Sequence, residues 1–140
     1  MKIFLDANIL ISVINKEYPL FTISSRILSL SGHPRFQVFT SPICLAITFY
    51  FAEKKQKSTA LKKIQLLCDN LLITDISPGI VKKVVENKKI TDFEDGLEYY
   101  AALEAGCKCI ITEDTGDFHF ADCEVLNSDH FFMKYMAKQV

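Results

Sequence analysis

Short apolar runs alternate along the chain with segments whose apolar residues recur at helical spacing. Five runs have the length and composition of strands, and they cover Met1–Asp6, Gln37–Ser41, Leu71–Ile76, Cys107–Thr112 and Glu124–Asn127. Strands that alternate with helices predict parallel pairing, because each connection must cross back over the sheet. We therefore expect a single domain over residues 1–140 with an α/β fold, a three-layer α/β/α sandwich around a parallel sheet of roughly five strands.

Capping residues mark where most of the expected helices begin and end. Ser41-Pro42 and Ser77-Pro78 are start signals, with Ser as the N-cap and Pro at the first helical position. Gly32 and Gly106 are expected just beyond helix ends. The first helix is expected to begin at Ala7 and Asn8, with Asn as a favourable cap. The remaining helices are expected over residues 21–31, 42–55, 57–70, 78–87, 92–105 and 128–138.

The composition narrows the class of protein. Hydrophobic residues make up 49% of the chain and charged residues 24%, which excludes intrinsic disorder and low-complexity classes. Sixteen basic and seventeen acidic side chains leave a net charge of −1, so a nucleic-acid partner would need a local basic face. Five cysteines, an odd number, indicate reduced thiols in the cytoplasm. No apolar run reaches the length of about 18 residues typical of a membrane helix.

Four acidic residues lie where an open α/β sheet places its ligands. Asp6 ends the first strand, Asp95 lies in the first turn of the helix before the fourth strand, and Asp114 and Asp117 follow that strand. Such positions converge beyond the carboxyl ends of the strands. Carboxylates that converge repel one another, and a hard divalent cation with oxygen ligands relieves the repulsion. The placement predicts a Mg²⁺ or Mn²⁺ site that binds phosphate and activates water.

Each acid also has a structural explanation. Thr91 to Glu94 has the pattern of a capping box, which gives Glu94 a structural role and leaves Asp95 free. If Asp92 is the cap instead, Asp95 becomes the third position of the box. Glu98 lies one turn further on roughly the same face, where it either supports the site or is solvated. No single acid is persuasive, and their joint placement carries the prediction.

Three sequence motifs occur in a fixed order along the chain. The motifs, with the last expected strand, are Phe4–Leu10, Asp92–Leu97 followed by Ala101–Gly106, Ile110–Phe118 and Glu124–Asn127. Together they resemble the PIN-domain family, which includes the VapC-type ribonuclease toxins. The resemblance covers essentially the whole chain and matches the family in length and in the order of elements.

The resemblance implies a Mg²⁺- or Mn²⁺-dependent endoribonuclease. Asp6, Asp95 and Asp117 match the acids that hold the metal and are the expected catalytic residues, Asp114 is a further expected ligand or support, and Asn8 is expected to orient Asp6. The resemblance also implies an RNA substrate, a small antitoxin protein as partner in a toxin–antitoxin pair, and a homodimer. No membrane partner is expected.

One position departs from the family pattern. The family has Glu, or in some branches Asn, in the helix after the second strand, and this chain has Ile47. Thr48 is adjacent but points elsewhere, and Glu53 lies about 240° further round the helix. Ala7 also replaces the family's usual Thr beside the first Asp. We therefore expect weaker metal binding, completed by phosphate from the substrate.

Two other function classes compete with the nuclease. A catalytically degenerate PIN fold that binds RNA or protein is favoured by Ile47. A phosphohydrolase of the haloacid dehalogenase type also begins with an Asp at a strand end, but it requires a second Asp where Asn8 stands. Cys107 and Cys109 share one face of a strand without a second ligand pair, so they are expected in the core and not at zinc.

Overall fold

Five parallel strands form one sheet in the computed structural model, which describes residues 1–137. The strands are β1 (Lys2–Leu5), β2 (Gln37–Thr40), β3 (Leu72–Ile73), β4 (Cys109–Ile111) and β5 (Glu124–Leu126). Their order across the sheet is β3-β2-β1-β4-β5, and every neighbouring pair is parallel. The expected five-stranded parallel sheet is confirmed.

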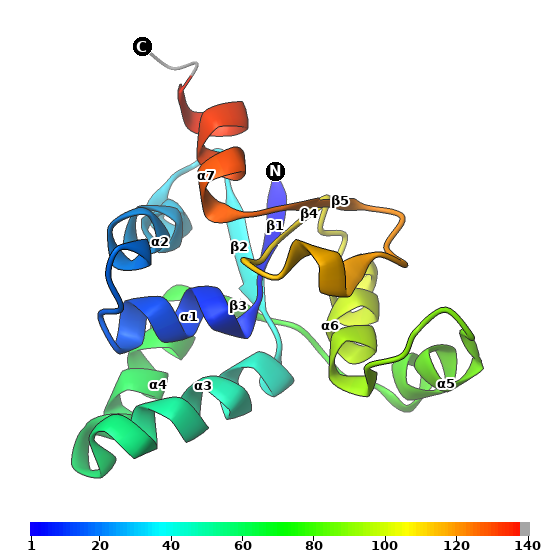
Figure 1. The fold of residues 1–140 in the computed structure, drawn as a ribbon, viewed down its shortest axis with the longest axis horizontal. Helices are drawn as coiled ribbons and strands as arrows, with labels where there is room; N and C mark the ends of the chain where they lie inside the picture. The colour runs from blue at the N-terminus through cyan, green and yellow to red at the C-terminus, as the bar shows by residue number, and fades with distance from the viewer. Residues whose placement is uncertain (138–140) are drawn as a thin grey trace.

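Helices cover both sides of the sheet. They are α1 (Ala7–Ile14), α2 (Leu20–Leu28), α3 (Pro42–Lys55), α4 (Ala60–Asn70), α5 (Pro78–Glu86), α6 (Phe93–Glu104) and α7 (Ser128–Phe131). Short 3₁₀ segments span Ser29–Gly32, Lys57–Thr59 and Thr115–Phe118, and a π-helical turn spans Phe132–Met136. Figure 1 shows α1 to α4 on one side of the central strands and α5 and α6 on the other, which confirms the three-layer α/β/α sandwich. None of the helices within the described residues has the length and apolar character needed to cross a membrane.

The central strands form the core of the sheet. Ile3, Phe4 and Leu5 of β1 are completely buried, as are Ile110 and Ile111 of β4. Burial on both faces explains why these strands are continuous apolar runs, since helices cover each side of a parallel sheet. Cys107 and Cys109 lie in the core, as expected, and both are buried free thiols.

Capping contacts explain several helix boundaries. The Ser41 hydroxyl accepts a hydrogen bond from the Cys44 N–H at 3.1 Å, and the Ser77 hydroxyl accepts one from Ile80 at 3.2 Å. Gly106 has φ +84° just beyond α6, so its predicted role at a helix end is confirmed.

Two expected helix ends are wrong. The N-cap of α1 is Asp6 and not Asn8, because the Asp6 carboxylate accepts a hydrogen bond from Ala7 N–H at 2.6 Å. Gly32 does not have a positive φ, and it ends a 3₁₀ turn that continues α2. The chain therefore leaves α2 through a tightened last turn and not through a left-handed glycine.

Some elements are shorter than expected. β3 pairs with β2 over only two residues and lies at the edge of the sheet, where a single neighbour supports it. The expected helix over residues 57–70 begins as a 3₁₀ turn. The final helix, expected over residues 128–138, is α7 followed by the π-helical turn, and residue 138 lies outside the described residues.

The strand order places a topological switch point between β1 and β4. From β1 the chain builds outward to β2 and β3 on one side, and then returns to place β4 and β5 on the other. Ligands of open α/β sheets bind beyond the carboxyl ends of the strands at such a point. The fold therefore brings the end of β1 and the end of β4 together as the candidate site.

Candidate functional site

A cavity of about 290 Å³ at the carboxyl ends of β1 and β4 is lined by six carboxylates. They come from three separate segments, the end of β1, the start of α6 and the loop after β4, and are Asp6, Glu94, Asp95, Glu98, Asp114 and Asp117. The four acids predicted as metal ligands therefore lie on one cavity. They do not lie on opposite sides of the sheet, which would have excluded a shared site.

Asp6 is the most rigidly held of these carboxylates. It is 7% exposed, and one carboxylate oxygen accepts the Ala7 N–H that caps α1. The other oxygen accepts a hydrogen bond from the Thr112 hydroxyl at 2.7 Å. The end of β4 thus fixes the orientation of the side chain at the end of β1.

Asn8 links the two strand ends. Its amide nitrogen donates to the Thr112 hydroxyl at 3.0 Å and to the Asp114 carboxylate at 3.2 Å, and it lies 3.5 Å from Asp6. Its amide oxygen accepts the Glu113 N–H at 3.2 Å. Asn8 therefore holds Asp6 largely through Thr112, a residue that no sequence motif singled out for this role.

Asp95 lies in the first turn of α6, and the cap of that helix is Asp92. The Asp92 carboxylate accepts the Asp95 N–H at 3.0 Å, so the expected capping box from Thr91 to Glu94 is wrong and the alternative that begins at Asp92 holds. This frees Glu94 to line the cavity. Burial, and then repulsion by Asp92, raise the pKa of Asp95 from 3.8 to about 7.

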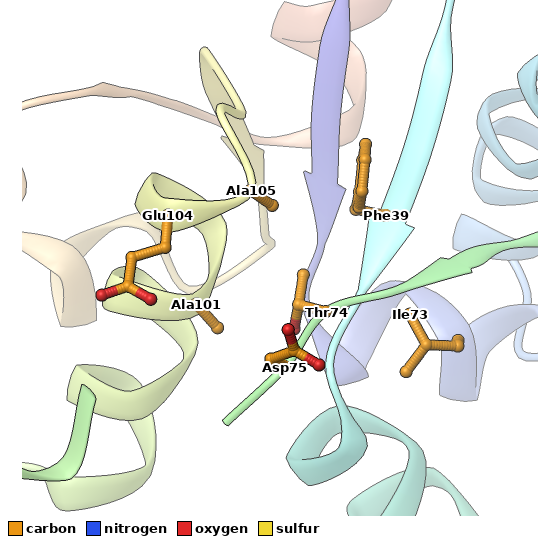
Figure 2. A pocket seen from close by; sticks show the side chains of 7 residues that line it. All are labelled: Phe39, Ile73, Thr74, Asp75, Ala101, Glu104 and Ala105. Atoms are coloured by element: carbon orange, nitrogen blue, oxygen red, sulfur yellow. The ribbon is translucent and has the colours of Figure 1, made fainter. Parts of the chain in front are cut away.

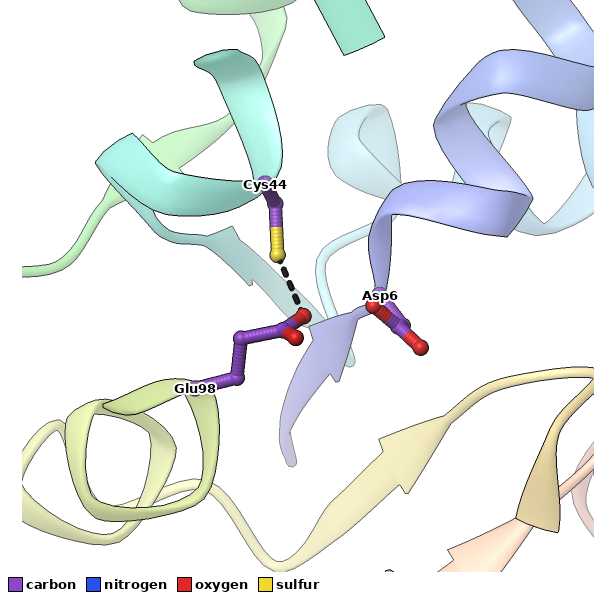
Figure 3. Close-up of side chains that lie close together, drawn as sticks. All are labelled: Asp6, Cys44 and Glu98. Atoms are coloured by element: carbon purple, nitrogen blue, oxygen red, sulfur yellow. Dashed lines mark hydrogen bonds between the residues drawn. The ribbon is translucent and has the colours of Figure 1, made fainter. Parts of the chain in front are cut away.

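Glu98 is buried next to Asp6 and is not solvated. It is 1% exposed, and its carboxyl accepts a hydrogen bond from the Cys44 thiol at 2.7 Å. Figure 3 shows the Glu98 and Cys44 side chains converging from α6 and α3 beside the end of β1. Potential metal-ligating atoms of Asp6, Cys44 and Glu98 lie within 4.8 Å of one another.

Burial changes the protonation of this group. Loss of solvent, and then the neighbouring Asp6 carboxylate, raise the pKa of Glu98 to about 11. Burial and the nearby carboxylates raise the pKa of the Cys44 thiol well above its usual value. Near neutral pH both groups carry their protons, so Glu98 and Cys44 are neutral neighbours of Asp6.

Ile47 faces the cavity, as the sequence alignment places it. It lines the cavity together with Phe51 from the next turn of α3. Thr48 is fully buried, and its hydroxyl donates to the Cys44 carbonyl at 2.7 Å. Glu53 is not among the residues that line the cavity. The wall that α3 contributes to the cavity is therefore apolar.

Asp114 and Asp117 differ in their surroundings. Both are exposed, but Asp114 is tied to Asn8, whereas no hydrogen bond to the Asp117 carboxylate is found within residues 1–137. Asp117 also lines an adjoining hollow of about 340 Å³ with Asp95 and His119. The carboxylate of Asp117 is thus free to turn into the cavity.

The donor set fits a divalent cation. Each of the three ion pairs formed within residues 1–137 uses an acid outside the cavity, namely Glu86, Glu104 or Glu124. No basic side chain in the described part of the chain therefore neutralises the cavity acids. Oxygen ligands in this number suit Mg²⁺ or Mn²⁺, with water completing the shell where carboxylates are distant.

A second cavity, of about 240 Å³, lies between β2, β3 and α6. Figure 2 shows it lined by Phe39, Thr74, Asp75 and Glu104, among others. Glu104 is already paired with Lys83 at 3.1 Å. Its other carboxylate, Asp75, is exposed. This second cavity therefore lacks the group of converging acids that lines the cavity at the ends of β1 and β4.

Known proteins resemble this chain over most of its length. A family profile described as PIN domain matches residues 2–116. A curated protein, Ribonuclease VapC1 of Aquifex aeolicus (strain VF5), is 28% identical over 134 residues, covering 93% of this chain and 92% of the relative.

Solved structures share the fold. A chain of VapBC2 from Rickettsia felis, solved bound to a DNA fragment from its promoter, is 24% identical with a TM-score of 0.66, covering 91% of this chain and 98% of that one. VapC20 of Mycobacterium tuberculosis, described as a Sarcin-Ricin loop cleaving toxin, is 14% identical with a TM-score of 0.66, covering 87% and 98%. At these identities the likeness extends to the fold alone.

Proposed function

Because this chain belongs to the PIN-domain family, we propose that it is a metal-dependent endoribonuclease and the toxin of a toxin–antitoxin pair. The observation that carries the proposal is the single cavity lined by six carboxylates from three segments. The name of the Aquifex relative, a ribonuclease, supports the same activity.

The catalytic residues proposed are Asp6, Asp95 and Asp117, which would hold Mg²⁺ or Mn²⁺ with support from Asp114. The cation, when bound, polarises a phosphoryl oxygen and lowers the pKa of a bound water so that it can attack an RNA phosphodiester.

The remaining residues of the site position these acids. Thr112 and Ala7 fix the two oxygens of Asp6, and neutral Glu98 keeps a second negative charge away from it. Asp95, whose pKa is raised to about 7, would give up its proton near neutral pH in order to hold the cation. Ile47 supplies no oxygen, so phosphate oxygens of the substrate would have to serve as further ligands.

The partners follow from the same assignment. VapBC2 from Rickettsia felis and FitAB, each solved with a bound DNA fragment, share the fold, as does VapC20 of Mycobacterium tuberculosis, described as a cleaving toxin. We propose a small antitoxin protein as partner, RNA as substrate, a homodimer as the assembly, and the cytoplasm as the location.

Cleavage of labelled RNA tests the activity. Mn²⁺ is expected to support cleavage and excess EDTA to abolish it, while Asp95→Asn removes the activity. Asp129→Asn, an exposed acid on α7, is the matched control and should cleave like the parent. Cleavage that persists in the Asp95→Asn protein purified in the same way would contradict the proposal.

A degenerate, non-cutting PIN fold is the second candidate. The apolar Ile47 on α3, where the family pattern has Glu or Asn, favours it. This candidate predicts RNA or protein binding with no cleavage at any Mn²⁺ concentration. The same assay therefore separates the two.

A further inference from the structure

Two neighbouring aromatic side chains are exposed on α3, and one of them, Phe51, lines the carboxylate cavity. Tyr50 is 53% exposed and Phe51 is 42% exposed. Their ring centroids are 5.3 Å apart with an interplanar angle of 84°. Covering rings this exposed is favourable, because it removes apolar surface from water.

A cation accompanies the two rings. The Lys54 ammonium lies 4.5 Å from the Tyr50 centroid and 6.0 Å from the Phe51 centroid. Lys54 is exposed and takes no part in the ion pairs found within residues 1–137. Its charge is therefore available to an anion that approaches the rings.

We call Tyr50, Phe51 and Lys54 the aromatic platform. Helical spacing connects this platform to the site. Cys44, Ile47 and Phe51 are three and four residues apart and so share a face of α3. Cys44 lies beside Asp6, and Ile47 and Phe51 both line the carboxylate cavity. The stripe therefore runs from the floor of the site to solvent over about 10 Å of helix.

The platform is also anchored. The Asn15 side chain donates to the Phe51 carbonyl at 3.3 Å, and the Lys55 ammonium donates to the Asn15 carbonyl. These contacts join the end of α3 to the end of α1, the helix that Asp6 caps. The backbone that carries the two rings is consequently fixed relative to Asp6.

We propose that Phe51, Tyr50 and Lys54 form a stacking site for one unpaired base of the RNA substrate next to the cleaved phosphate. The inference rests on the proposed ribonuclease function and adds to it the residues that hold one base of the substrate. Aromatic faces stack on unpaired bases, and a lysine beside them meets the phosphate backbone. A base within a duplex is covered on both faces and paired at its edge, so a duplex is excluded.

Equilibrium binding tests the stacking site. The probe is a short fluorescein-labelled oligouridylate, alone or annealed to oligoadenylate, in Ca²⁺ in place of Mn²⁺ with its integrity checked on a gel. Phe51→Leu is expected to weaken binding of the single strand at least about fivefold, from the typical strength of one base–aromatic stack. Phe51→Tyr should restore most of the affinity, and the duplex should bind weakly throughout.

A matched control is available at the opposite end of the molecule. Phe132 follows α7, and the Arg26 guanidinium lies 5.0 Å from its ring centroid, so it reproduces an aromatic–cation pair far from α3 (Figure 1). Phe132→Leu should leave the affinity unchanged. Lys54→Met should weaken binding and reduce the dependence of log Kd on log salt by about one unit.

The outcomes separate this inference from the proposed function. Should Phe51→Leu, Phe51→Tyr and Lys54→Met all bind and cleave RNA like the parent, the stacking site is overturned and the nuclease stands. Equal affinity for duplex and single strand also overturns it. If circular dichroism shows that the Phe51→Leu protein is unfolded, the binding of Phe51→Tyr and Lys54→Met decides whether the stacking site exists. A parent that neither binds nor cleaves RNA overturns both proposals.

Discussion

At the scale of single residues, the apolar side chain of Ile47 sets the expected strength of metal binding. It lines the cavity at a position where a carboxylate would face the other acids. Ile47→Glu should tighten Mn²⁺ binding by about tenfold, equivalent to about 1.4 kcal/mol, and raise cleavage. Titration calorimetry measures the affinity, and Ile47→Leu is the control that changes shape without adding oxygen. Tight binding by the parent that Ile47→Glu does not improve would contradict this account.

The two acids after β4 should differ in their effect on activity. Asp114 is held by Asn8, whereas Asp117 is free to turn toward a cation. Asp117→Asn should lower cleavage by about a hundredfold or more, and Asp114→Asn by less. The metal-free Tm of Asp117→Asn should equal or exceed that of the parent because repulsion falls. A greater loss in Asp114→Asn would show that Asp114 is the ligand.

The raised pKa of Asp95 predicts how stability depends on pH. The folded protein holds this proton up to about pH 7, whereas the unfolded chain releases it near 3.8. Between these values the folded state binds more protons, so the free energy of unfolding of the metal-free protein falls as pH rises. Asp95→Asn should flatten this slope in urea titrations in EDTA from pH 4 to 7. A slope identical to that of the parent would contradict the prediction.

Sequence reasoning found the acids of the site but not their neighbours. Asp6 directly follows β1 and Asp117 lies in the segment after β4, and the pattern of apolar runs reveals both strands. The burial of Glu98 and its contact with Cys44 depend on how α6 and α3 pack together. The sequence of either helix alone does not determine the distance between the two helices. The expected solvated alternative for Glu98 was therefore wrong.

At the scale of elements, close packing of α6 on α5 aligns the acids on α6. A Cβ on Gly96 would lie 2.7 Å from Val84 and 2.8 Å from Ile90. Gly96→Ala gains about 1 kcal/mol of helix propensity, but overpacking costs about 1–3 kcal/mol. We expect a net loss of stability and, since Asp95 and Glu98 move with the helix, lower cleavage.

Gly79 provides the matched control for this prediction. A Cβ there would meet only the Ser77 hydroxyl at an ordinary 3.6 Å, in the first turn of α5. Gly79→Ala should therefore keep or slightly increase stability in chemical denaturation. If the Gly96→Ala protein is more stable than the Gly79→Ala protein, the side chains around Gly96 move apart at little cost in free energy, which would contradict the prediction.

The elements that the sequence predicted best are those with local signals. Ser41-Pro42 and Ser77-Pro78 mark the starts of α3 and α5 because their capping contacts lie within a few residues. β3 was expected over six residues and pairs over two, because its length depends on contact with β2. The hydrophobic pattern within one segment does not show how many of its residues pair with another strand.

At the scale of the whole molecule, a divalent cation should stabilise the fold. The cavity acids lack a basic partner within residues 1–137, so binding relieves repulsion present only in the folded state. Mn²⁺ at about a hundred times its Kd should raise Tm by roughly 5–10 °C. Scanning calorimetry with and without EDTA measures the shift. It should vanish in Asp6→Asn, and an equal shift in that variant would place the cation elsewhere.

The fold class and layers followed from the alternation of strands and helices, but the order of strands did not. A pattern of five apolar runs is compatible with several parallel orders, and the observed β3-β2-β1-β4-β5 arrangement is one of them. The predicted acids nevertheless line one cavity, because carboxyl ends of parallel strands share one edge in every such order.

The long separation between the two halves of the site has a consequence for protein synthesis. The ribosome makes Asp6 well before the Thr112 hydroxyl that orients it, which follows 106 positions later. At ordinary elongation rates this interval is about 5–20 s. A nascent chain therefore lacks an assembled centre until the segment that contains β4 has been made. An enzyme that cuts RNA would in this way be kept from acting beside its own message during that interval.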